Sequence, residues 1–185
     1  MGNMAETKRL IIRPYETDDV DAVWQVVRRE EIYTTTYAIP KDYTRERVEW
    51  WISFVENCRK NGTSLEFGMF DKKSGRYIGN CGLINIKKQH KSADICYFID
   101  PDLFSMGYAT EGAEAMLSLA FYVLTLNRVG GVCMTINPAS RRVMEKLGFL
   151  YEGTGRSELL KDGTFYDLDH LSILRDEFIT SRLKK

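Results

Sequence analysis

The first segment whose residues could bind a ligand is residues 101–110, Pro-Asp-Leu-Phe-Ser-Met-Gly-Tyr-Ala-Thr. They lie between a strand-like run and a helical run, and they end in small residues. Backbone N–H groups at the start of that helix can converge on an anion, and a phosphate group would fit there. The alternative is an ordinary strand-to-helix loop in which Gly107 allows a tight turn.

The second such segment is Asn137-Pro138-Ala139-Ser140, which begins an amphipathic stretch that ends at Gly148. Asparagine is a favoured helix cap, and proline at the first helical position loses no hydrogen bond. The pattern therefore predicts a helix that places Ser140 in its first turn. A hydroxyl there can serve as a proton donor, or it can simply bond to the backbone.

Strand-like and helix-like runs alternate along the chain and would position both segments. Helices are expected after Thr17-Asp18-Asp19 and from Thr44 to Gly62, where apolar residues recur at helical spacing. Two more helices are expected over 110–126 and 137–147, whereas residues 33–40 are expected to be a linker. Strands are expected over 9–14, 65–70, 76–86, 93–99 and 128–136, followed by two that flank the turn at 161–164 and end near 174.

Composition limits the classes of function that are possible. The chain has 185 residues, 44% of them apolar, which suits one globular domain over 1–185 with a loose N-terminus at 1–6. Lysine and arginine together number 26, as do aspartate and glutamate, so no positive field would hold a nucleic acid. The sequence shows neither a signal-peptide profile nor an apolar run of membrane-spanning length, which predicts a cytoplasmic protein without a membrane partner.

Cysteine and histidine usage argues against a metal site. The four cysteines lie far apart, inside apolar stretches, and form no Cys-x-x-Cys pair, which is typical of reduced core cysteines. Only two histidines are present, so we expect no metal.

Taken in order, these motifs resemble the GNAT superfamily of N-acetyltransferases, and particularly the branch that acetylates the N-terminal alanine or serine of ribosomal proteins. The resemblance covers nearly the whole chain. It implies an α/β (α+β) fold with a mixed, mostly antiparallel, seven-stranded sheet, splayed between the fourth and fifth strands, and helices on both faces. The segments that carry it are residues 6–14, 78–83, 94–99, 107–111, 126–129, 137–140 and 145–149.

The resemblance also implies acetyl-CoA as the acetyl donor and a place for it. Main-chain groups of Phe98 and Ile99 would bond to the pantetheine amides, and Asn137 and Ser140 would hold the same arm. The loop formed by Met106, Gly107, Tyr108, Ala109 and Thr110 would surround the pyrophosphate. Relatives usually have an aromatic residue, a glycine and a basic residue before that glycine. This chain has Phe104, Ser105 and Met106 there, which predicts weaker attraction for phosphate.

Two catalytic roles follow from the same family positions. Ser140 would donate the proton to the departing thiolate, and Asp94 would accept the proton of the amine, either directly or through a water molecule. The alternative for Asp94 is a solvated residue that alternates outward on its strand. A backbone N–H near Ile99 would stabilise the oxyanion.

The acceptor is expected to be a primary amine that enters between the first two helices and the last hairpin. Tyr33, Tyr37 and Trp51 are candidate wall residues, and Glu30, Glu31, Glu66 and Glu111 could attract a cation. Three hypotheses remain open: a protein N-terminal acetyltransferase, a small-molecule acetyltransferase for a polyamine, amino sugar or amino acid, and a non-catalytic acyl-CoA-binding module. A homodimer is a further expectation from the family.

Overall fold

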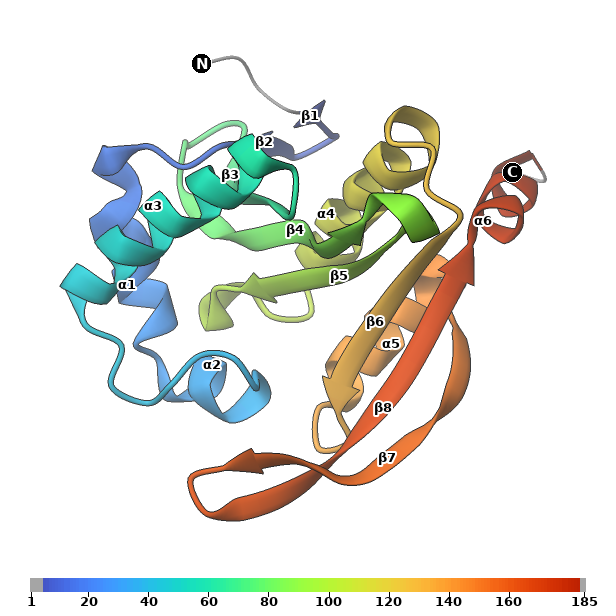
Figure 1. Cartoon of the computed structure of the whole chain (residues 1–185). Coiled ribbons are helices and arrows are strands. Elements are labelled where there is room, and N and C mark those ends of the chain that lie inside the picture. The colour runs from blue at the N-terminus through green and yellow to red at the C-terminus, as the bar shows by residue number, and fades with distance from the viewer. Residues whose placement is uncertain (1–4, 184–185) are drawn as a thin grey trace.

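One twisted sheet runs through the chain and carries helices on both faces (Figure 1). The computed structural model describes residues 5–183. The strand order is β1-β2-β3-β4-β5-β6-β8-β7. All pairings are antiparallel except β5 with β6. The strands are β1 (Ala5–Glu6), β2 (Leu10–Arg13), β3 (Leu65–Asp71), β4 (Tyr77–Lys87), β5 (Ser92–Ile99), β6 (Arg128–Met134), β7 (Leu150–Lys161) and β8 (Thr164–Leu174).

The helices are α1 (Val20–Val27), α2 (Glu30–Thr35), α3 (Arg45–Asn61), α4 (Tyr108–Ser118), α5 (Pro138–Leu147) and α6 (Arg175–Leu183), with short turns between several of them. Local chemistry sets their ends. The Thr44 hydroxyl accepts the Arg47 N–H at the start of α3, and Gly62 ends the helix with φ +67°. Asn137 caps α5 in the same way through the Ser140 N–H, and Gly148 ends it with φ +95°. Within residues 5–183, none of the helices combines the length and apolarity that crossing a membrane requires.

Two apolar clusters fill the faces of the sheet. Residues of α4 and α5, such as Met116 and Met144, pack with the sheet on one face. On the other face α1, α2 and α3 pack over Phe70 and Tyr77. Side chains of β5 alternate between the clusters, so that Ile95 and Ile99 join the first and Phe98 the second. The two clusters therefore meet across β5, at the centre of the sheet.

The hairpin of β3 and β4 has a fixed register despite one irregularity. Asp71 organises the turn, because its carboxylate accepts the N–H groups of Lys73 and Ser74. A bulge between Met69 and Phe70 then absorbs one extra residue of β4, after which the pairing runs evenly to Leu65. This register decides which β3 side chains face α3.

The fold class implied by the resemblance is confirmed, with three local differences. The sheet has an eighth strand, because Ala5 and Glu6, expected to be loose, pair with Ile12 and Ile11; residues 1–4 of that expected N-terminus lie outside the described residues. Part of the expected linker at 33–40 is helical, in α2. The expected helix over 110–126 begins at Tyr108 and changes after Ser118 into a π-turn over Leu119–Val123.

A further helix, α6, follows β8 and was not predicted. Its Phe178 is 1% exposed and packs against the Phe121 ring, with 5.2 Å between the ring centroids. Only one residue of α6 is buried, so its apolar periodicity is too short to distinguish it from a polar tail.

Phe178→Ala should lower the free energy of unfolding by about 3–5 kcal/mol, because it leaves a cavity beside Phe121 that the π-turn cannot fill. Guanidinium unfolding followed by fluorescence measures the loss. Leu183→Ala is the control: Leu183 is 83% exposed in the same helix, and its loss should change stability by about 0.5 kcal/mol or less. A loss below about 1 kcal/mol for Phe178→Ala would mean that α6 is not docked.

Candidate active site

The parallel pairing of β5 with β6 stops early and opens the sheet. It joins residues 92–94 of β5 to residues 128–130 of β6, and among the described residues it goes no further. Beyond it β5 remains paired with β4, and β6 with β8. Main-chain groups on the facing edges of both strands are therefore left without a strand partner. This is the splay that the resemblance implies between the fourth and fifth strands, here β5 and β6.

A cavity of about 650 Å³ lies at this splay. Residues 95–99 of β5 and 132–134 of β6 line it, together with α1, α2, the chain before α3, the loop before α4, and α5. Gly131 lets α5 approach closely, because a Cβ there would come 2.4 Å from the Met144 sulfur. The cavity thus joins the opened strands to both helical layers.

The loop before α4 reaches the cavity with its backbone at the helix start. Gly107 has φ +82° and caps α4, whose first residues Tyr108, Ala109 and Thr110 line the cavity. Their N–H groups lie in the first turn of α4, where no carbonyl of a preceding helical turn can accept them. Ser105, in place of the glycine usual in relatives, also takes a left-handed conformation, with φ +62°. The loop keeps its shape at a conformational cost on the order of 1 kcal/mol.

Met106 lies on the other side of this loop. Its side chain is 51% exposed, it is not among the residues that line the cavity, and its carbonyl accepts a hydrogen bond from Arg9 at 2.9 Å. The Arg9 guanidinium also stacks over the Tyr108 ring at 4.1 Å and pairs with Glu111 at 2.7 Å. Burial opposes ionisation of Glu111, but hydrogen bonds from Thr7 and Arg9 outweigh it and lower its pKa. Arg9 therefore braces the loop, and its charge is balanced by Glu111.

Two cations that the sequence analysis missed line the cavity from α5. Arg142 and Lys146 stand one turn apart on the face of α5 that also presents Ala139 and Val143 to the cavity. Arg142 is 67% exposed, and its ion pair with Glu145 is long, at 3.6 Å. These side chains can supply the positive charge that Met106 does not. Their spacing of three and seven residues from Ala139 was the available signal.

Asn137 and Ser140 are held together at the start of α5. Asn137 accepts the Ser140 N–H at 3.1 Å and donates to the Thr35 carbonyl of α2 at 2.9 Å. The Tyr97 hydroxyl donates to the Ser140 carbonyl at 3.0 Å and lies 3.1 Å from the Ser140 hydroxyl. Burial raises the pKa of Tyr97, and its bond with Ser140 opposes that rise. The Ser140 hydroxyl is thus bonded to another hydroxyl, at the edge of the cavity.

The acidic candidates occupy different surroundings. Asp94 accepts a hydrogen bond from Asn85 at 3.0 Å and lies against Gly130, just before the splay; it is not among the residues that line the cavity. Its role as the proton acceptor stays a prediction. Glu31 pairs with Arg29 on the surface, and Glu30 is exposed. Of the four glutamates that could attract a cation, Glu66 lines the cavity.

The three predicted wall residues do not all line the cavity. Tyr37 and Trp51 line the cavity, as do Phe98 and Ile99. Tyr33 does not: its hydroxyl bonds to Asp162 at the tip of the last hairpin, and the Lys161 ammonium lies 4.0 Å above its ring. Lys161 also donates to the carbonyls of Tyr33 and Thr36. Tyr33 therefore joins α2 to the hairpin, and its contact with an acceptor stays a prediction.

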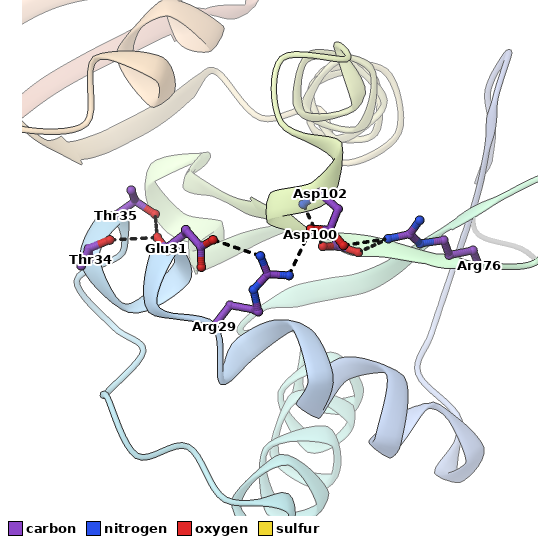
Figure 2. A network of polar contacts seen from close by, with 7 residues as sticks. All are labelled: Arg29, Glu31, Thr34, Thr35, Arg76, Asp100 and Asp102. Carbon is purple, nitrogen blue, oxygen red and sulfur yellow. Dashed lines mark hydrogen bonds and ion pairs between the residues drawn. The ribbon is translucent and has the colours of Figure 1, made fainter.

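Ion pairs connect the start of α2 to the turn that precedes the loop before α4 (Figure 2). Arg29 bonds to Glu31 at 3.0 Å and to Asp102 at 3.1 Å. Asp100 is 6% exposed; it accepts the Asp102 N–H at 3.1 Å and pairs with Arg76 at 2.6 Å. The end of β5, the loop before α4 and the wall of the cavity are thereby held by one network.

Comparison with known proteins identifies the family. Residues 9–150 match the family model described as "Acetyltransferase (GNAT) domain". The chain is 30% identical over 178 residues to YoaA of Bacillus subtilis (strain 168), named an uncharacterized N-acetyltransferase, and the match covers 95% of this chain and 98% of YoaA. The chain therefore belongs to the GNAT acetyltransferase family. It is an acyltransferase enzyme and not the non-catalytic module of the third hypothesis.

Solved structures share the fold at lower identity. The spermidine N-acetyltransferase of Vibrio cholerae, in complex with CoA and spermine, has a TM-score of 0.82 and 21% identity, covering 94% of this chain and 99% of its own. RimL, a ribosomal-protein alpha-N-acetyltransferase in complex with coenzyme A, has a TM-score of 0.85 and 17% identity, covering 95% and 99%. The fold is thus common to enzymes named for different acceptors.

Asp100→Ala should lower the free energy of unfolding by about 1–3 kcal/mol, because it removes a buried carboxylate that accepts the Asp102 N–H and makes the shorter of the two ion pairs of Arg76. Thermal and guanidinium unfolding measure the change. Asp102→Ala, which removes a carboxylate that is 59% exposed, should cost less than about 1 kcal/mol. Equal losses of stability for the two variants would contradict the conclusion that Asp100 contributes more to this network than Asp102.

Proposed function

We propose that this protein transfers the acetyl group of acetyl-CoA to a primary amine. The observation that carries the proposal is the single cavity at the splay. It is lined on one side by the start of α4 and the cations of α5, and on the other by α1, α2, α3 and Glu66. One side suits an anionic, amide-containing donor, and the other suits a cationic acceptor.

The residues present fit acetyl-CoA in three respects. The edge of β5 at Phe98 and Ile99 offers main-chain groups to the amides of the pantetheine arm, in the manner of an added strand. The N–H groups of Tyr108, Ala109 and Thr110 suit a pyrophosphate. Arg142 and Lys146 add positive charge from α5 on the same side of the cavity. This support compensates for the serine and methionine in the loop.

The chain's own residues suit the proton transfers of acetyl transfer. The amine must lose a proton before its nitrogen can attack, and the departing thiolate must gain one. Ser140 is proposed to give the second proton, because its hydroxyl lies at the edge of the cavity, where the Tyr97 hydroxyl at 3.1 Å holds it in place. A backbone N–H near Ile99, left without a strand partner, is proposed to stabilise the oxyanion. Asp94 remains the acceptor of the first proton that the sequence suggests.

Two classes of acceptor are candidates. A protein N-terminal α-amine, the first choice from sequence, is supported by the likeness to RimL. A small-molecule amine is favoured by one observation, the bonds from Lys161 that fasten the last hairpin to α2. They close the side on which a folded protein would have to approach. A cytoplasmic location and a homodimer are proposed from the sequence and its resemblance alone.

Isothermal titration of acetyl-CoA tests the donor half of the proposal, and mass spectrometry of a panel of amines tests the transfer. We expect saturable binding, which the Arg142→Ala/Lys146→Ala double variant should weaken about tenfold, or about 1.4 kcal/mol. The control is Lys73→Ala/Lys87→Ala, two exposed lysines away from the cavity, which should leave the dissociation constant unchanged. Absence of binding by the wild type at millimolar acetyl-CoA would refute the proposal.

Ser140→Ala should lower kcat about tenfold or more while leaving the dissociation constant of acetyl-CoA within about twofold, because the hydroxyl acts on the leaving sulfur. Steady-state release of the CoA thiol measures kcat. Ser53→Ala removes a hydroxyl that bonds only to the Glu49 carbonyl on α3, and it should be neutral. Full turnover by Ser140→Ala would show that the proton comes from elsewhere.

A further inference from the structure

Glu66 reaches across the sheet toward the splay. In the paired register Glu66 of β3 lies opposite Gly82 of β4, which lies opposite Cys96 of β5. Gly82 provides the passage, because a Cβ there would come 2.7 Å from the Glu66 Cγ. The Glu66 carboxylate therefore lies over β4, with Oε2 3.6 Å from the Cys96 sulfur. Only β5 separates β4 from the opening between β5 and β6.

Buried polar groups fix the orientation of this carboxylate. Asn80, 2% exposed, donates to Glu66 Oε2 at 3.1 Å. Its own Oδ1 accepts the Tyr15 hydroxyl at 2.7 Å, which sets the direction of the amide, and Tyr15 lies 3.2 Å from Tyr77. Both protein hydrogen bonds thus go to Oε2. Oε1 has no partner among the described residues, yet it is not sealed from solvent, so it is the oxygen free for a ligand.

Glu66 forms no ion pair with any described cation. The titratable groups around it are the Cys96 thiol of β5, the Cys81 thiol and Tyr77 hydroxyl of β4, the Tyr15 and Tyr43 hydroxyls, and the Glu56 and Arg59 pair of α3. Arg59 is engaged by Glu56 at 2.7 Å. Burial raises the pKa of Glu66, and the bonds from Asn80 and Cys96 only partly offset it. A positive ligand would supply the missing counter-charge.

The rest of the acceptor side is mostly apolar, and its other polar side chains are Asn80, Thr35, Thr36, Tyr37 and Tyr43. The apolar surface is formed by Val23, Val27, Ile32, Ile39, Tyr43 and Trp51. The two threonines at this wall have their hydroxyls engaged by helix carbonyls: Thr35 donates to Glu31, and Thr36 donates to Ile32 at 2.7 Å. Few groups remain to bond to peptide amides or to a second ammonium. Glu66 is the one acidic residue among those that line the cavity in the described chain.

We infer that Glu66 binds and deprotonates the acceptor amine, and that the acceptor is a small primary amine with one positive charge on an apolar or aromatic body. The inference rests on the proposed acetyl transfer. A polyamine would have to place its second ammonium against the valine and isoleucine side chains, where an unpaired charge is costly. A peptide would leave its amides without partners there.

The protons of the reaction balance with Glu66 in this role. An ammonium group carries three protons on its nitrogen. The first proton passes to Glu66 Oε1 and from there to water. The nitrogen lone pair then forms the C–N bond to the acetyl carbon as the C–S bond breaks. The second proton restores the Ser140 hydroxyl after Ser140 has given its own proton to the departing sulfur, and the third stays on the amide nitrogen. A carboxylate with a raised pKa suits the first transfer, since a stronger base is needed than an exposed glutamate provides.

The test compares Glu66→Gln with the wild type on two amines, 2-phenylethylamine and spermidine. We expect the wild type to prefer 2-phenylethylamine in kcat/KM, and Glu66→Gln to lower that kcat/KM at least about 100-fold. For the wild type, kcat/KM should fall as pH falls through the Glu66 pKa, and the variant should lack this limb. Glutamine can keep the bonds to Asn80 and Cys96, so Glu66→Gln should unfold at no lower temperature than the wild type.

Two further variants make the comparison specific. Glu49→Gln removes an exposed carboxylate of α3 and should match the wild type. Glu66→Asp keeps the charge but withdraws it from the cavity, and it should retain the acid limb at reduced kcat/KM. Titration of 2-phenylethylamine into the CoA-saturated protein measures amine binding without turnover, and Glu66→Gln should weaken it at least about tenfold.

The outcomes separate this inference from the proposed function. Acetylation of spermidine in preference to 2-phenylethylamine would overturn the inference and leave acetyl transfer intact. Wild-type kcat/KM in Glu66→Gln, with the loss appearing in Asp94→Asn instead, would do the same. Acetyl-CoA binding without transfer to any amine would refute the proposed function, and the binding titration would then still decide whether Glu66 holds an amine.

Discussion

The early end of the pairing between β5 and β6 is the constraint on which the rest of the structure depends. A parallel pair that continued would satisfy every main-chain group on both edges and leave no space between the strands. Because it stops after residue 94, two edges remain unpaired in the middle of the sheet. Helices α4 and α5 then stand on either side of the opening, and the cavity is a consequence of the gap that they flank.

The surroundings of the gap are rigid for the same reason. An opening in a sheet would close or fray unless its borders were fixed from elsewhere. Here Tyr97 ties β5 to α5 through Ser140, Asn137 ties α5 to α2, and Lys161 ties α2 to the last hairpin. Each bond joins a residue to a segment far away in the sequence. The site is therefore held by tertiary contacts and not by local structure.

This dependence explains how far sequence alone could go. The caps of α3 and α5 and the turn of the last hairpin are local, so Thr44, Asn137 and residues 161–164 predicted them correctly. The loop before α4 was placed by its residues and by resemblance. Helix α2 was missed because its six residues show no full apolar period. The position of Glu66 could not be predicted, since it follows from the register of three strands and from the missing side chain at Gly82.

The bulged hairpin of β3 and β4 limits which changes in the amino-acid sequence the site can tolerate. The turn after Asp71 is exposed, and such turns usually accept both substitutions and changes of length. Side chains of a strand alternate between the two faces, however, and the bulge beside Met69 already takes up one residue. If one residue were inserted into or deleted from the turn, β3 could slide by one position along β4. Glu66 would then lie on the face that packs against α4, and a core residue would enter the cavity. The turn is thus free in composition but fixed in length, a constraint that no single substitution would reveal.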